Sequence, residues 1–225
     1  MATTAAPTRS IPPRSARTRS DLREAEREVR PVNPKQLNWG NSAPLALAAF
    51  GVTTFMLSMV NANLISPSVK PGVFGTALLF GGFTQLIAGI IQLRTGNTFT
   101  GVVFTGYGGF WMSLAAIALW FLKAVPTTQG GHTVGLFLYA FGIFTVFVWI
   151  ASFRTNAIVV LALTLLVPAF FLLAAGNYGA HPTWIQWGGY LGLAAAGCAF
   201  YLAVSELCEA VYERAIFPVG SLARR

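Results

Sequence analysis

Neutral polar side chains inside long apolar segments are the groups of this sequence that could act on a solute. In hydrocarbon such groups are costly unless they pair across helices or line a wet cavity. Hydroxyl and amide groups suit the binding of a small polar or anionic solute; alternatively, they bond their own helix carbonyls or join neighbouring helices. The residues of this kind in the first half of the chain are Thr53, Thr54, Ser58, Asn61, Gln85, Thr105 and Tyr107.

Titratable groups are scarce in the apolar part of the chain. No Asp or Glu lies between Glu28 and Glu206, which excludes paired-carboxylate catalysis and carboxylate metal sites over that length. His132 and His181 fall in or beside loops, apart from any Cys or carboxylate, so we expect neither a metal site nor a serine hydrolase. We therefore predict no enzyme activity, no metal and no cofactor. Glu206 either pairs at a membrane interface or, alternatively, takes part in proton coupling.

The composition is that of a membrane protein. The 225 residues are 55% hydrophobic and 10% charged, with a mean hydropathy of +0.62, which leaves too little polar surface for a water-soluble globule. A net charge of +8 could suggest nucleic acid, but eight of the fifteen basic residues lie in the first 35 positions. That pattern is typical of a tail, so we expect no nucleic-acid partner.

Six apolar segments have the length needed to cross a bilayer as helices, about 20 residues each. An even number places both termini on one side. Arg94, Arg154 and Arg214 share the side of the basic tail, whereas Lys70 and Lys123 lie opposite, so the positive-inside rule predicts cytoplasmic termini and a multi-pass protein of the cytoplasmic membrane. The expected spans are residues 43–61, 73–93, 101–122, 134–152, 157–175 and 183–204.

The expected organisation is a six-helix transmembrane domain between two tails. Residues 1–38 form a basic tail, expected to be disordered, with a docking or regulatory helix as the alternative. Residues 39–210 form the membrane domain and 211–225 a short basic carboxyl-terminal tail. The first residues lead into a charged segment and not an apolar one, so no cleavable signal peptide is expected.

The two halves of the membrane domain share a pattern. Gly-Asn at 96–97 with Gly-Gly at 108–109 recurs at the same spacing as Gly-Asn at 176–177 with Gly-Gly at 188–189. Three helices per repeat would cross in opposite directions, giving the inverted symmetry common in transporters. The alternative is chance similarity between glycine-rich membrane segments.

Several motifs resemble those of one known family. Residues 41–47, with Asn41, Pro44 and Leu45, resemble the Asn-Pro-Ala-Pro-Leu-Gly-Leu signature of the acetate uptake transporters, which include bacterial succinate-acetate permeases and fungal ammonia/acetate export proteins. This chain departs from the signature at Ser42, where Pro is usual, and at Ala46, where Gly is usual. The similarity runs from about residue 38 to 220, with further matching motifs at 96–99, 104–111 and 201–203.

The resemblance implies a homo-hexamer of six-helix protomers, each with its own narrow path for acetate, succinate and other short carboxylates. It also implies that a Phe, a Tyr and a Leu pinch this path. Phe50 and Tyr107 match the motif positions, and the Leu falls at Leu166, with Leu163 one turn earlier as the fallback, because Pro168 departs from the family's usual pattern. The neutral groups expected along the path are Thr53, Thr54, Asn61, Gln85 and Thr105.

We accordingly expect acetate to enter with weak steering by Lys70 and Lys123. Whether it moves through a channel or together with a proton stays open, as does the direction of net flux. Two other functions also remain open. One is a channel for ammonia or another small neutral solute, and the other is a non-transporting membrane sensor that acts through its basic tail.

Overall fold

The computed structural model describes residues 39–222. The basic tail of residues 1–38, with its expected disorder or docking helix, and the arginines at 224 and 225 lie outside this range. Within it, the chain is built from helices, and the one β-type contact is an isolated bridge between Asn156 and Ser221. The predicted all-α architecture is confirmed.

Six helical stretches are long and apolar enough to cross a membrane, as predicted. The first matches its expected bounds, but the second begins six residues earlier than expected, at Pro67, and the last continues eight residues past 204, to Tyr212. The apolar pattern marks only the part that faces hydrocarbon, whereas caps, Gly and Pro set where a helix ends. The stretches comprise α2 (Ala43–Asn61), Pro67–Arg94, α5 (Thr98–Leu119), Thr127–Ser152 including α6 (Gly130–Ser152), α7 (Ala157–Tyr178) and α8 (Pro182–Tyr212).

The second stretch is not a regular α-helix. It consists of a short 3-10 turn (Pro67–Val69), α3 (Lys70–Thr76), a π-helical segment η4 (Ala77–Thr84) and α4 (Gln85–Arg94). Such wider turns within helices often occur at functional sites. The sequence pattern did not predict this π-helical segment, which ends immediately before Gln85.

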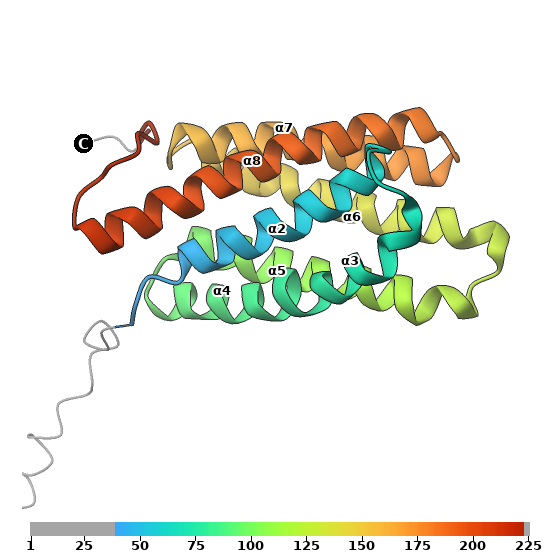
Figure 1. Ribbon diagram of the computed structural model, residues 1–225, viewed down its shortest axis with the longest axis horizontal. Coiled ribbons are helices and arrows are strands. Elements are labelled where there is room, and N and C mark those ends of the chain that lie inside the picture. Colours follow the sequence, from blue (N-terminus) through green and yellow to red (C-terminus); the bar gives the residue numbers. More distant parts are fainter. Residues whose placement is uncertain (1–38, 223–225) are drawn as a thin grey trace, which may run out of the picture. The chain divides into compact units, whose positions relative to one another are not determined.

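The helices pack in a bundle with α2 and α6 between two pairs. Figure 1 shows α7 and α8 along one side and α4 and α5 along the other, and the contacts agree: α2 packs against α8, η4 and α4, while α6 packs mainly against α7. The inverted repeat and the cytoplasmic termini stay predictions.

The chain after α8 folds back onto the start of α7. The Ala157 and Leu222 N–H groups donate to the carbonyls of Gly220 and Thr155, and the Tyr201 hydroxyl donates to the Pro218 carbonyl. At the same place the Asn156 side chain caps α7 by accepting from the Val159 N–H at 2.9 Å. The predicted carboxyl-terminal tail is thus packed on the bundle through residue 222.

Close packing between α4 and α5 depends on a glycine. A Cβ at Gly108 would lie 2.7 Å from the Leu86 backbone nitrogen, closer than side chains approach backbone. Gly109, its neighbour in α5, has nothing within 4 Å of its Cβ position. Substitutions at Gly108 and Gly109 therefore distinguish an effect on helix–helix packing from an effect on the helix itself.

We predict that Gly108→Ala lowers the melting temperature of the purified protein in detergent, by the equivalent of about 1–3 kcal/mol, because α4 and α5 must move apart. Gly109→Ala is the matched control and should leave the melting temperature unchanged or slightly raised, since Ala favours helix. Equal losses for both variants would show that this contact does not limit stability.

Candidate functional site

Two cavities lie inside the bundle and adjoin at one residue. The small cavity, of about 80 Å³, is lined by side chains of α2, α4, α5, α7 and α8. The large cavity, of about 390 Å³, is lined from α2, α3, α5, α6, α7 and α8. Leu166 lines both. A solute that moved through the protomer would therefore pass this point.

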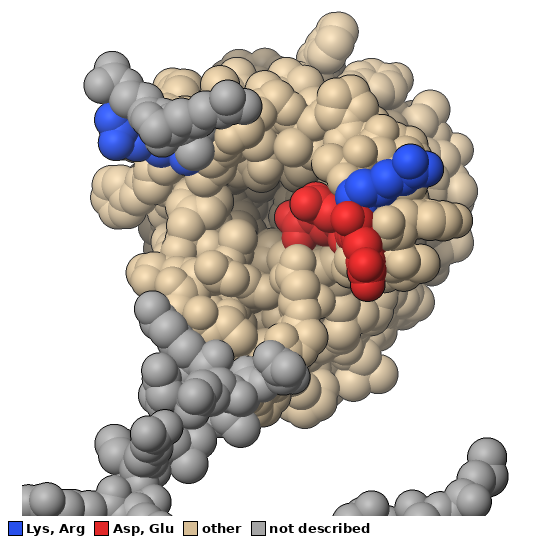
Figure 2. All heavy atoms as spheres, turned by 90° about the vertical axis from the view of Figure 1, so that its left-hand side faces the viewer, with Lys and Arg blue, Asp and Glu red and all other residues tan. Residues whose placement is uncertain are grey.

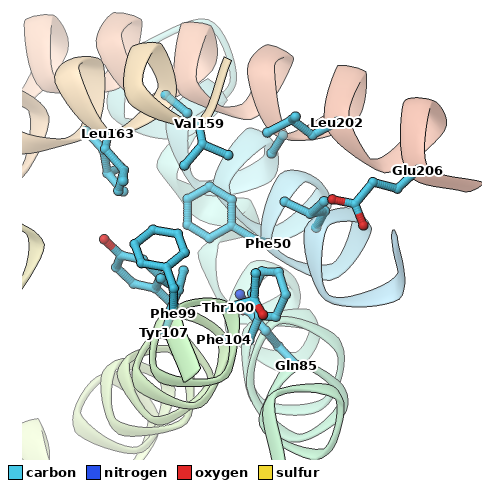
Figure 3. Close-up of a pocket in the computed structure, with 15 residues that line it drawn as sticks. Phe50, Gln85, Phe99, Thr100, Phe104, Tyr107, Val159, Leu163, Leu202 and Glu206 are labelled. Carbon is cyan, nitrogen blue, oxygen red and sulfur yellow. The ribbon is translucent and has the colours of Figure 1, made fainter. Parts of the chain in front are cut away.

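Aromatic rings pack together in the interior of the bundle, in the same cluster as Leu166. The Phe50 and Tyr107 ring centroids lie 5.4 Å apart, and Tyr107 stacks on Phe170 at 6.4 Å. Phe50 and Tyr107 line the small cavity (Figure 3). Phe170 lines the large one. These rings form an apolar boundary between the two cavities. The contacts bring together Phe50, Tyr107 and Leu166, although their role as a pore constriction stays a prediction.

Tyr107 is fixed on its other sides as well. It is buried, with a residual exposure of 2%, and its hydroxyl donates a 3.0 Å hydrogen bond to Thr145 Oγ1. Thr145 in turn donates to the Phe141 carbonyl, and the Phe144 ring meets Tyr107 edge-on at 5.7 Å. The phenol is therefore held by α6 while its ring faces α2 and α7. Leu163, the fallback for the helix-five position, lines only the small cavity.

Three of the expected polar groups line the cavities. Gln85 is fully buried in the small cavity, and neither its amide nitrogen nor its amide oxygen has a hydrogen-bond partner within the described residues. Thr54 lines the large cavity, and its hydroxyl is likewise without a protein partner there. Asn61 lines the same cavity, together with Lys70. Buried polar atoms left free are costly, so these groups are available to a solute or to water.

Thr53 and Thr105 lie differently. Each hydroxyl donates to a carbonyl one turn earlier in its own helix, Thr53 to Ala49 at 2.9 Å and Thr105 to Gly101 at 2.7 Å. Neither residue is among those that line the two cavities. Their expected place on a substrate path has no support from these contacts, which match the alternative of bonding within the helix. Lys123 does not line either cavity, unlike Lys70.

The signature residue Asn41 belongs to a polar network at the end of the small cavity. Its Nδ2 donates to Glu206 Oε2 at 3.2 Å, and its Oδ1 accepts from the Ala43 N–H at 3.0 Å and from Gln92 Nε2 at 2.9 Å. Gln92 Oε1 accepts from Asn97 Nδ2 at 2.8 Å. Asn41 therefore joins the start of α2 to α4 and α8.

The orientation of the Gln92 amide follows from these neighbours. Reversing it would bring its oxygen near the Ser42 and Ala43 N–H groups, at 3.3 and 3.2 Å, but would place that oxygen 2.9 Å from Asn41 Oδ1. Asn41 Oδ1 is an acceptor, because Asn41 Nδ2 is the atom that faces the Glu206 carboxylate. The orientation in which Gln92 donates to Asn41 is therefore the consistent one.

Sequence reasoning missed this network. Gln92 is buried, with 2% exposure, inside an expected span, and its polarity in an apolar run was the available signal. Ser42, a departure from the signature, is used here: its hydroxyl donates to the Ala88 carbonyl at 2.8 Å. Pro44 is buried in the first turn of α2, whereas Leu45 is 48% exposed and lines neither cavity.

Comparisons with known proteins agree with this arrangement. The profile of the GPR1/FUN34/yaaH family matches residues 25–223. The chain is 31% identical over 180 residues to the succinate-acetate/proton symporter SatP of Escherichia coli (strain K12), covering 80% of this chain and 95% of that protein. It is 35% identical over 174 residues to ammonia transport outward protein 2 of Saccharomyces cerevisiae, covering 75% of this chain and 62% of that protein.

A solved structure shares the fold. The structure of the bacterial acetate channel SatP superposes with a TM-score of 0.75 at 30% identity, over 81% of this chain and 100% of that chain. These relatives are named as transport proteins and not as enzymes, in line with the prediction of no enzyme activity. The predicted multi-pass protein of the cytoplasmic membrane is confirmed. The chain belongs to the GPR1/FUN34/yaaH family, the family that its motifs predicted.

Proposed function

We propose that this protein passes acetate, with succinate and other short carboxylates as further substrates, across the cytoplasmic membrane through a path inside each protomer. The observation that carries the proposal is the pair of cavities that adjoin at Leu166 beside the Phe50 and Tyr107 rings. The names of the bacterial relative and of the solved structure support the choice of substrate. The homo-hexamer implied by the resemblance remains a prediction.

On this proposal the large cavity receives the hydrated anion. At about 390 Å³ it has room for acetate with several waters, and Lys70 supplies the positive charge in its lining. Asn61 contributes an amide and Thr54 a hydroxyl without a protein partner. Neutral donors and one cation favour an anion without holding it tightly, which conduction requires.

Passing the aromatic boundary is the demanding step. An anion loses water between Phe50, Tyr107 and Leu166, and an unpaired charge in an apolar environment is strongly disfavoured. On the far side the free Gln85 amide can donate to a carboxylate. A small carboxylate therefore loses few water molecules when it passes these side chains. A larger carboxylate needs a wider opening between them.

A second candidate is passage of ammonia or another small neutral solute. The apolar lining of the small cavity and a yeast relative named for ammonia transport favour it. The protein in liposomes distinguishes the two, with labelled acetate and labelled methylammonium as probes and empty vesicles as control, because free acetic acid crosses lipid. Acetate entry above the empty vesicles supports the proposal. Methylammonium entry alone would replace it by the second candidate.

We predict that Leu166→Ala raises the rate of succinate entry relative to acetate several-fold, because it removes a side chain that lines both cavities. Leu161→Ala is the matched control on the same helix, since Leu161 is exposed on the bundle surface. The ratio of initial rates in liposomes measures the effect. An unchanged ratio in Leu166→Ala, or the same rise in Leu161→Ala, contradicts the assignment of Leu166 to the constriction.

We also predict that Lys70→Gln slows acetate entry by about two- to five-fold at low ionic strength and much less at high salt, because long-range steering by a charge is screened by salt. Lys123→Gln should have little effect, since Lys123 lines neither cavity. Initial rates at two salt concentrations provide the measurement. A salt-independent loss in Lys70→Gln would mean that Lys70 acts by packing and not by charge.

A further inference from the structure

Among the residues that the structure describes, Glu206 of α8 is the one carboxylate that lines the small cavity. Figure 3 shows its side chain reaching toward the pocket on the side opposite Tyr107. It is half-buried and accepts one hydrogen bond, from Asn41. Figure 2 shows that acidic side chains gather at the hollow on this face of the bundle. A negative charge therefore stands at one end of the proposed path, while Lys70 stands at the other.

Among the described residues, no basic side chain shares a cavity with Glu206, although Figure 2 shows Lys or Arg side chains beside the acidic group at the surface. Glu206 lines three cavities, and no Lys or Arg lines any of them in the part of the chain that the structure describes. Glu209, one turn further along α8, lines one of the three and adds a second negative charge. The helices α2 and α7, which pack against α8, carry no Asp, Glu, His, Lys or Arg. The nearest basic residue after α8 along the chain is Arg214.

The small cavity also contains a free group that points to a ligand. The Gln85 amide is fully buried and without a partner, as described above. The other polar groups of the lining are occupied, since the Thr100 hydroxyl donates to Gln92 Oε1 at 3.1 Å and the Tyr107 hydroxyl donates to Thr145. Gln85 is thus the available donor in this cavity, and a carboxyl group is a ligand that it suits.

A substrate carboxylate in this cavity would lie close to the Glu206 carboxylate. The cavity measures only about 80 Å³, and apart from Gln85, Thr100 and Tyr107 the rest of its lining is apolar. Two carboxylates that share such a site do not both ionise; one of them holds a proton and donates it to the other. The proton comes from the solution at this end of the bundle, and no other bond is made or broken.

We propose that Glu206 is a proton-linked gate: a short carboxylate occupies the small cavity only when one proton is shared between the substrate carboxyl and Glu206. This inference rests on the proposed function and adds a group that makes passage depend on pH. At low pH Glu206 is neutral and the cavity admits the anion. At high pH Glu206 is ionised and repels it.

The test uses the full-length protein in liposomes and follows the exchange of labelled acetate at equal internal and external pH. The acetate anion concentration is held constant while the pH is changed from mildly acidic to mildly alkaline, and empty vesicles are subtracted. The wild-type rate should fall several-fold with rising pH. Glu206→Gln should lose this fall and exchange at alkaline pH as fast as the wild type does at acidic pH, because Gln cannot ionise.

Two matched variants identify the group. Glu206→Asp retains a titratable carboxyl and should keep the fall with pH, and Glu209→Gln removes the neighbouring charge outside the small cavity and should resemble the wild type. A wild-type pH profile in Glu206→Gln, or loss of the fall in Glu209→Gln, overturns the inference. A wild type no faster than empty vesicles overturns the proposed function itself, so the two failures are distinguishable.

A measurement on the wild type alone tests the inference even where a variant does not assemble. Infrared difference spectra with and without acetate, recorded with ordinary and carbon-13 acetate, separate the protein carboxyl bands from those of the substrate. Acetate binding should produce a band of a protonated carboxyl, on the protein or on acetate. Its absence, with acetate bound, contradicts the shared proton.

Discussion

The stacking of Tyr107 between α2, α6 and α7 is the interaction on which the rest of this structure depends. Its ring packs against Phe50 and Phe170, and its hydroxyl is fixed by Thr145. The rings lie where the two cavities adjoin, and the Tyr107 hydroxyl is engaged by Thr145 of α6. Elsewhere in the bundle, glycines such as Gly108 let the helices approach closely enough to hold the rings in place.

The charges at the two ends are unlike. Lys70 lines the large cavity and Glu206 the small one, and no other charged side chain of residues 39–222 lines either. An anion is therefore favoured at one end and opposed at the other, unless a proton is present. The Asn41 network holds Glu206 in place and links it to α4 through Gln92. Asn41 of the signature motif thus joins the start of α2 to Glu206, which lines the small cavity.

Much of this could be predicted from the sequence because membrane helices obey strong constraints. The six spans follow from apolar length, and the motif positions of Phe50 and Tyr107 fall together in space as expected. Leu166, the predicted position in the fifth span, lies where both cavities meet, and α7 continues through Pro168 without a break. It was harder to predict whether a polar side chain on a helix faces a cavity or bonds its own helix. Thr53 and Thr105 have the polarity of path residues, yet their hydroxyls bond their own helices.

Other features depend on contacts between distant segments and could not be read from local pattern. The π-helical segment before Gln85 has no distinctive composition, and the Gln92 network joins three helices. The return of the chain after α8 onto α7 likewise depends on backbone hydrogen bonds, which the residue types do not predict.

The most direct measurement of the central claim is cysteine accessibility across the aromatic boundary. In a background with Cys198 and Cys208 replaced by Ala, Ala162→Cys places a thiol in the small cavity and Thr54→Cys places one in the large cavity. A charged, membrane-impermeant thiol reagent is applied to oriented vesicles from each side. Each thiol should react from its own side only, and acetate should slow both reactions. Reaction of both thiols from the same side, or no protection by acetate at either, would contradict a single acetate path through the two cavities.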